Sequence, residues 1–179
     1  MRVLVVASVI VWSLFGVAPP ARSEGAGPSL QNEEDDKALT AKACGAAEVN
    51  YDHDTDKKQH PTPETTPGQA LVYVVRPTNY GGAIQSKVAV DGAWKGVNKG
   101  KNYFFFTLEP GEHFFCSKAE NRSVMALTME GGKTYYLQQK IRMGFNKARN
   151  KLEVIDERDG QKALEDSRLS TWKEKPKSK

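Results

Sequence analysis

The sequence predicts an all-β fold: a single small antiparallel β-sandwich of about seven or eight strands, with one short C-terminal helix. Two observations in residues 70–170 support this fold class. β-Branched and aromatic segments recur about every 8–12 residues, a spacing typical of sandwiches and barrels. Asp-Gly, Pro-Gly and Gly-Gly pairs separate these segments, and such pairs supply the positive φ angles that tight turns require.

The first hairpin is expected near the start of this region. Residues 70–77, ALVYVVRP, have the composition of a strand, and the terminal proline ends it because proline cannot donate to a sheet. Residues 83–92 alternate and end in Asp91-Gly92, a strong hairpin signal because a type I′ turn needs positive φ at both central positions. Residues 93–97 then form the return strand.

Two more hairpins are expected downstream. Residues 102–119 surround Pro110 and Gly111, a pair that suits a type II turn because proline presets φ and glycine accepts positive φ. Residues 123–141 are interrupted by a Gly-Gly pair. The strand before the Pro-Gly turn, NYFFFTL, is apolar on both faces and is therefore expected at the centre of a sheet.

The C-terminal part supplies one strand and one helix. Residues 150–156, NKLEVID, are expected to form the last strand. Residues 156–169 are expected to form a short helix, which Asp156 can cap and Gly160 weakens. Residues 171–179 are expected to form a basic, disordered tail.

The N-terminus predicts export. An apolar run over residues 3–17 has the length of a signal-peptide core and is too short to span a membrane. Ala21 and Ser23 are small residues suited to a cleavage site, so residues 1–23 are expected to be a signal peptide; the alternative is an uncleaved anchor. The mature chain is expected to be periplasmic or secreted, with no transmembrane segment.

Charge divides the remaining chain into two parts. Residues 24–69 hold ten acidic and four basic residues, whereas residues 70–179 hold twenty basic and twelve acidic residues. The first part is proline-rich and poor in large apolar residues, so we expect a largely irregular leader. The basic part either attracts polyanions, contacts the leader or is simply solvated, and composition leaves these alternatives open.

Four motifs in series carry a family resemblance. They are QALVYVVRP (69–77), VAVDGAWKGVNKG (88–100), YFFFTLEPGEH (103–113) and GKTYYL (132–137). Together they resemble the bacterial exported family called domain of unknown function 2846. The VDG and PGEH motifs also resemble the PEGA domain. The resemblance implies an immunoglobulin-like or PEGA-like sandwich in the cell envelope and implies no catalytic residues.

Cys44 and Cys116 are the only cysteines. An even count in an exported chain favours a disulfide, and two free thiols are the alternative. The bridge would close a loop of about 70 residues and attach the leader to the sandwich.

Two groups of side chains are candidates for a binding face. The aromatic group would be a stacking platform if it shared one outer face, although core packing is the simpler role for these rings. The basic group suits an anionic cell-wall polymer or an envelope protein; nucleic acid is not expected outside the cytoplasm. The candidates are Tyr80, Trp94, Tyr103 and Phe105, and Lys140, Arg142, Lys147 and Arg149.

Residues 52–60, DHDTDKKQH, contain alternating aspartates and two histidines. Lys57 and Pro63 occupy the positions where an EF-hand loop requires glycine and glutamate. Two histidines on an unordered loop do not make a zinc site. We therefore expect a solvated loop and no metal or cofactor.

No Gly-x-Ser-x-Gly motif, phosphate loop or evident pair of catalytic carboxylates occurs in the sequence. The sequence therefore predicts a non-enzymatic envelope or extracellular module that binds a protein or glycan or has a structural role. Two alternatives are an enzyme with an unrecognised site and a metal-dependent binder that uses residues 52–60.

Overall fold

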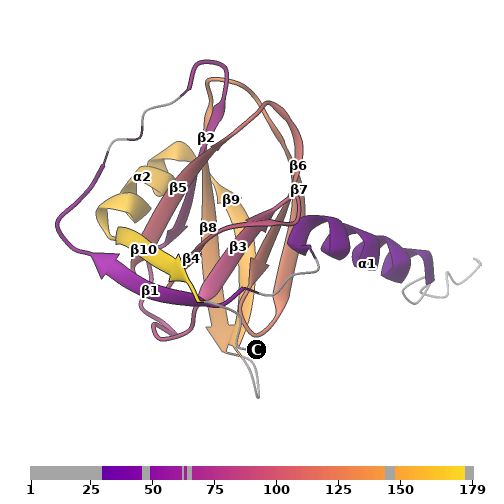
Figure 1. Cartoon of the computed structure of the whole chain (residues 1–179), viewed down its shortest axis with the longest axis horizontal. Helices are drawn as coiled ribbons and strands as arrows, with labels where there is room; N and C mark the ends of the chain where they lie inside the picture. Colours follow the sequence, from indigo (N-terminus) through magenta and orange to yellow (C-terminus); the bar gives the residue numbers. More distant parts are fainter. Residues whose placement is uncertain (1–29, 46–48, 62, 64–65, 144–147, 176–179) are drawn as a thin grey trace, which may run out of the picture.

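The computed structural model describes residues 30–45, 49–61, 63, 66–143 and 148–175. These residues form two β-sheets and two helices (Figure 1). The predicted signal peptide lies outside the described residues. Neither described helix combines the length and the apolar character needed to cross a membrane.

The strands divide into a large and a small sheet. The large sheet has the spatial order β1 (Tyr51–Asp56), β10 (Arg168–Glu174), β5 (Asn102–Leu108), β2 (Ala70–Arg76), β8 (Thr134–Met143) and β9 (Ala148–Ile155). The small sheet has the order β4 (Ala93–Asn98), β3 (Ser86–Val90), β6 (Gly111–Lys118) and β7 (Arg122–Met129).

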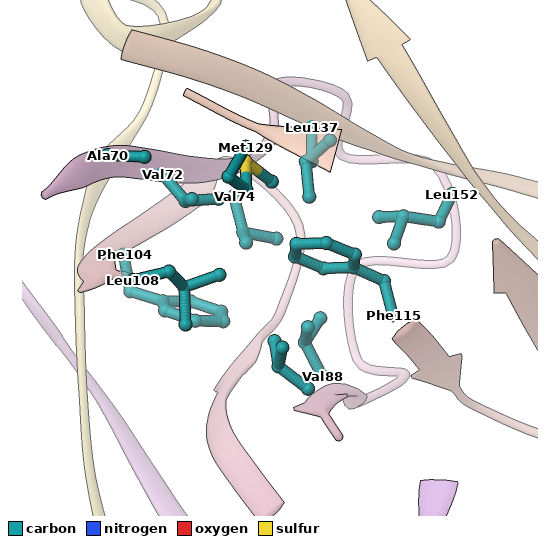
Figure 2. Packing of buried hydrophobic residues seen from close by; sticks show 11 residues of the cluster. Ala70, Val72, Val74, Val88, Phe104, Leu108, Phe115, Met129, Leu137 and Leu152 are labelled. Carbon is teal, nitrogen blue, oxygen red and sulfur yellow. The ribbon is translucent and has the colours of Figure 1, made fainter. Parts of the chain in front are cut away.

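The two sheets share one large cluster of buried apolar residues, so the fold is mostly β and sandwich-like. Alternate residues of a strand point to the same side, so Val72 and Val74 of β2 face the small sheet. Phe115 of β6 is completely buried, and Figure 2 shows its ring among side chains from both sheets, including Leu137 and Leu152. The core therefore depends on strands that are distant in sequence.

A helix covers the outer face of the large sheet. Helix α2 (Glu157–Glu165) begins at Asp156, whose carboxylate accepts a 2.8 Å hydrogen bond from the Asp159 amide, as predicted. A Cβ atom at Gly160 would collide with the Tyr136 ring. The glycine that weakens the helix in the sequence therefore allows the helix to approach the sheet.

The first predicted hairpin is confirmed, and the next two are wrong. Asp91 and Gly92 have φ angles of 51° and 79° in the turn between β3 and β4. In contrast, β5 and β6 belong to different sheets, as do β7 and β8. The Pro-Gly and Gly-Gly segments reverse or redirect the chain, but instead of pairing neighbouring strands they carry it from one sheet to the other.

The sandwich is mixed rather than purely antiparallel. Strand β2 pairs in parallel with β8, and β10 pairs in parallel with β5 over two residues. The described residues contain ten strands rather than seven or eight. Two of them, β1 and the second half of β10, lie in segments predicted to be irregular.

The predicted irregular leader contains a helix and a strand. Helix α1 (Leu30–Cys44) packs its last turn on the outer face of the small sheet, where Ala43 and Cys44 contact Ala89 and Cys116. Helices α1 and α2 lie on opposite sides of the body (Figure 1). Strand β1 pairs with β10 along its whole length, so Thr171–Glu174 belong to the sheet and not to a tail.

The predicted disulfide between Cys44 and Cys116 is confirmed. Both cysteines are buried, and 72 positions separate them in the sequence. The bond holds a helix that is otherwise polar and largely exposed, because most of its described side chains face solvent. The covalent link therefore compensates for the small apolar area that α1 can bury.

We expect the Cys44→Ser/Cys116→Ser variant to unfold with a free energy lower by ~4 kcal/mol, because its unfolded chain is no longer restricted by the long loop. Denaturant titration measures this change, and amide exchange should show α1 opening before the sheets. Reductant should destabilise the wild type and leave the variant unchanged. Equal stability of the two proteins without reductant would contradict the role given to the bond.

Candidate functional site: the basic end of the sandwich

A buried arginine organises one end of the core. The Arg76 side chain is completely buried at the end of β2. Its guanidinium donates hydrogen bonds to the carbonyl oxygens of Ile84 (2.5 Å), Tyr80 (3.1 Å) and Gly81 (2.6 Å). Burial lowers the pKa of Arg76 to about 10. Backbone dipoles compensate the buried charge, and the loop between β2 and β3 is held over the guanidinium.

Polar side chains continue this arrangement between the sheets. The Gln139 amide donates to the Ser86 carbonyl (3.2 Å) and the Ser117 hydroxyl (2.9 Å). The Asn150 amide donates to the same hydroxyl (2.8 Å), and the Asn98 amide donates to the Gln139 side-chain oxygen (3.1 Å). These five residues come from five strands, so the network fixes the relative position of the two sheets at this end.

The loop held by Arg76 presents an aromatic ring to solvent. The side chain of Tyr80 is 54% exposed. The loop also accepts hydrogen bonds from the next turn, from the Gly100 amide to the Gly82 carbonyl (3.1 Å) and from the Lys101 amide to the Thr78 carbonyl (3.3 Å). An aromatic side chain on a fixed loop loses little conformational entropy on binding and suits a recognition surface.

Basic side chains face each other in the adjoining β8–β9 ladder. Lys140 lies opposite Lys151, and Arg142 lies opposite Arg149. Like charges at directly opposite positions of a ladder repel each other. Glu153 compensates the lysine pair through ion pairs of 2.7 Å to Lys140 and 3.3 Å to Lys151, and the hydrogen bond from Lys140 contributes most to lowering the pKa of Glu153.

The arginine pair has no such compensation. Within the described residues, no carboxylate lies at ion-pairing distance from Arg142 or Arg149, and both side chains are exposed. On the α2 side, Asp159, Asp166 and Lys162 border a hollow beside Pro77, so the charge of that group of side chains is net negative.

We call this surface the basic end. It consists of Tyr80, Lys140, Arg142, Arg149 and Lys151, and the Tyr80 loop reaches β8 because a Cβ atom at the neighbouring Gly81 would lie 3.2 Å from the Ile141 side chain.

The structure separates the predicted candidate residues into different environments. Tyr80, Lys140, Arg142 and Arg149 belong to the basic end, and Lys147 lies outside the described residues. The remaining aromatics do not form a shared platform. Trp94 packs beside the disulfide on the small sheet, whereas Tyr103 and Phe105 lie on the outer face of the large sheet with the α2 cluster, with Tyr103 only 3% exposed.

Arg76, which supports the loop of the basic end from inside the core, was missed from the sequence. Arg76 stands in an otherwise apolar strand, VYVVRP, and a charged residue in such a strand is the signal that could have identified it. Lys151 belongs to the basic run seen in the sequence, but its position opposite Lys140 depends on the register of β8 and β9.

The Asp/His segment is a strand rather than a solvated loop over Asp52–Asp56. Asp52 forms a 2.7 Å ion pair with Lys175, and His60 stacks on the Tyr103 ring with 6.0 Å between ring centres. Burial and then the charge of Lys99 lower the pKa of His53. In the part of the chain that the structure describes, no three His, Cys, Asp or Glu side chains are grouped as metal ligands.

His113 follows the Pro-Gly turn and makes two hydrogen bonds with its ring nitrogens. Its Nε2 atom lies 2.8 Å from the Glu109 carbonyl oxygen, and its Nδ1 atom lies 2.6 Å from an Asp91 carboxylate oxygen. Both partners only accept hydrogen bonds, so both ring nitrogens must carry a proton to make these contacts. The imidazolium thus joins the β3–β4 turn to the connection between the sheets and has no free nitrogen for acid–base chemistry.

The family model described as "Protein of unknown function (DUF2846)" matches residues 66–151. This match confirms the resemblance to the DUF2846 family over that segment. No curated protein and no solved structure matches the chain. The DUF2846 segment contains β2 to β8 and the start of β9, and with them every residue of the basic end. Helix α1, β1, α2 and β10 lie outside it.

We expect Arg76→Lys to lower the free energy of unfolding by ~2 kcal/mol, because one ammonium group cannot replace the guanidinium at three carbonyl oxygens. Denaturant titration measures the loss, and amide exchange in residues 78–85 should accelerate. Arg158→Lys is the matched control, since Arg158 is 86% exposed. Unchanged exchange in this loop would show that Arg76 does not hold it.

We expect stability to fall as the pH rises through the pKa of His113. Burial alone would lower this pKa, but the hydrogen bonds to Asp91 and Glu109 outweigh burial and the nearby Lys95, so the pKa lies above 6.5. The contribution is therefore complete below the unfolded-state pKa of about 6.5 and is lost above the folded-state value.

NMR titration of the His113 ring and melting temperatures across this pH range measure the effect. Asp91→Asn keeps an acceptor for the Phe114 amide but removes the charge, and it should lower the pKa of His113. A pKa of His113 at or below 6.5 in the wild type would contradict the imidazolium assignment.

Proposed function

We propose that this protein is a non-enzymatic, exported module that binds an anionic partner through the basic end. The observation that carries the proposal is the β8–β9 ladder, in which Lys140 opposes Lys151 and Arg142 opposes Arg149. Such pairs destabilise the isolated sheet, and an anionic partner would relieve the repulsion.

The surroundings of the ladder support a binding role. Tyr80 is the exposed aromatic of this end, and Arg76 fixes its loop before any partner arrives. Tyrosine and arginine are the residue types that contribute most at recognition surfaces. The positive charge of the same end would also increase the rate of encounter with an anionic partner at low salt.

The chemistry of the cysteines supports export. Cys44 and Cys116 are joined and buried, and such structural disulfides are typical of the periplasm and of secreted proteins. The apolar run and small residues of the predicted signal peptide agree with this location. An anionic polymer of the cell wall or an acidic envelope protein is the kind of partner available there.

The described side chains favour binding over catalysis. The two cysteines are in the disulfide, and both nitrogens of His113 are occupied by acceptors. Nucleophilic and acid–base catalysis both need a reactive group with access to a substrate. The groups at the basic end instead supply positive charge and hydrogen-bond donors.

Retention on immobilised heparin, a sulfated glycan, tests the proposal. We expect Arg142→Glu/Arg149→Glu to elute at clearly lower salt than the wild type, with an affinity reduced about tenfold or more, because two contacts become repulsive. The control Lys133→Glu/Lys173→Glu changes the net charge by the same amount at exposed positions away from the basic end. It should elute close to the wild type.

Equal losses in the two variants would mean that net charge alone governs retention, and the basic end would then not be the binding site. Both substituted arginines are exposed, so melting temperatures near that of the wild type are expected.

A further inference from the structure

Arg142 and Arg149 form a pair of uncompensated cations with a defined geometry. They are opposite partners in the antiparallel β8–β9 ladder, so their side chains leave the same face of the sheet. The Cβ atoms of such partners are about 4.5–5.5 Å apart. The two guanidinium groups can therefore contact the same anionic group of a ligand without any change in the backbone.

The neighbouring row limits where an anion can bind. Glu153 lies between Lys140 and Lys151 and forms ion pairs with both. Its carboxylate compensates part of their charge and repels a second anion. The arginine row has no carboxylate partner among the described residues. An anionic group is therefore attracted to the arginine row rather than spread evenly along the strands.

We propose that Arg142 and Arg149 together bind a single phosphate group. This inference rests on the proposed function and names the chemistry that the basic end recognises. A guanidinium group donates two parallel N–H bonds to two oxygens of an oxyanion. One such fork is sufficient for a carboxylate, which has two oxygens. Two opposed forks match a tetrahedral group with more acceptor oxygens and up to two negative charges.

A variant that keeps the positive charges but loses the bidentate geometry tests whether the guanidinium forks are required. Arg142→Lys/Arg149→Lys keeps both positive charges but loses the planar forks. Inorganic phosphate is the probe, added to the full chain and followed by NMR of the arginine side chains and by calorimetry. We expect the wild type to bind phosphate and the lysine variant to bind at least tenfold more weakly. We also expect the lysine variant to keep most of its heparin retention.

The outcomes separate the two proposals. Equal phosphate binding by the wild type and the lysine variant would overturn the phosphate clamp and leave the basic end as a general polyanion surface. Absence of phosphate binding by the wild type would also overturn the clamp. Failure of the proposed function is a different result, namely heparin retention that does not depend on either arginine.

The same phosphate chemistry can come from a lipid headgroup or from a soluble phosphate ester. Vesicles of phosphatidylglycerol, with phosphatidylcholine vesicles as the uncharged reference, test the lipid source. Glycerophosphate tests the soluble source. Arginine-dependent binding to the charged vesicles would assign the clamp to a membrane surface, whereas arginine-dependent binding to glycerophosphate alone would assign it to a polymer or metabolite. Binding to neither would overturn the clamp.

Discussion

The buried guanidinium of Arg76 sets the constraint on which this end of the molecule depends. A charge cannot lie inside an apolar core without hydrogen bonds, because its lost hydration is not otherwise replaced. Three carbonyl oxygens of the β2–β3 loop meet this requirement, so the loop must fold back over the end of β2. The polar network around Gln139 then joins both sheets at the same level. One of these carbonyl oxygens belongs to Tyr80. Because the Tyr80 backbone faces Arg76, its ring is left facing solvent.

Much of the fold can be predicted from sequence because local chemistry specifies it. The Asp91-Gly92 turn, the Asp156 cap and the β2 strand each follow from a few residues whose backbone preferences are strong. The pairing of the strands cannot be predicted in this way. A Pro-Gly or Gly-Gly segment redirects the chain equally well within one sheet or between two, and the choice depends on the total apolar surface that must be covered. Both faces of β5 are apolar because one faces the core and the other lies beside the α2 layer. This pattern predicts that β5 is a central strand, but it does not predict which strands pair with it.

The candidate site was only partly predictable for the same reason. Lys140, Arg142 and Arg149 are visible as a basic run, but their significance depends on a cross-strand register that the sequence does not state. Tyr103 and Phe105 illustrate the opposite error, since aromatic residues in a strand are equally suited to an exposed platform and to a second buried layer. The leader was misjudged because its composition is too polar for independent folding. The disulfide and the β1–β10 pairing supply the order that its few apolar residues do not.

The two ends of β8 have different surroundings on the outer face of the large sheet. At one end, Tyr136 packs under Gly160 of α2 and its ring is buried. Toward the other end, the same face carries Lys140 and Arg142, and the covering helix is absent from the row they occupy. A sheet selected only for stability would place acidic residues beside these cations, as it does once with Glu153, which lies opposite Gln138 and pairs with Lys140. Arg142 and Arg149 have no such acidic neighbour among the described residues, and Arg76 with its hydrogen-bond network holds the backbone at this end of the sandwich. The rigid core therefore tolerates a repulsive surface pair, and an anionic partner would turn that repulsion into binding energy.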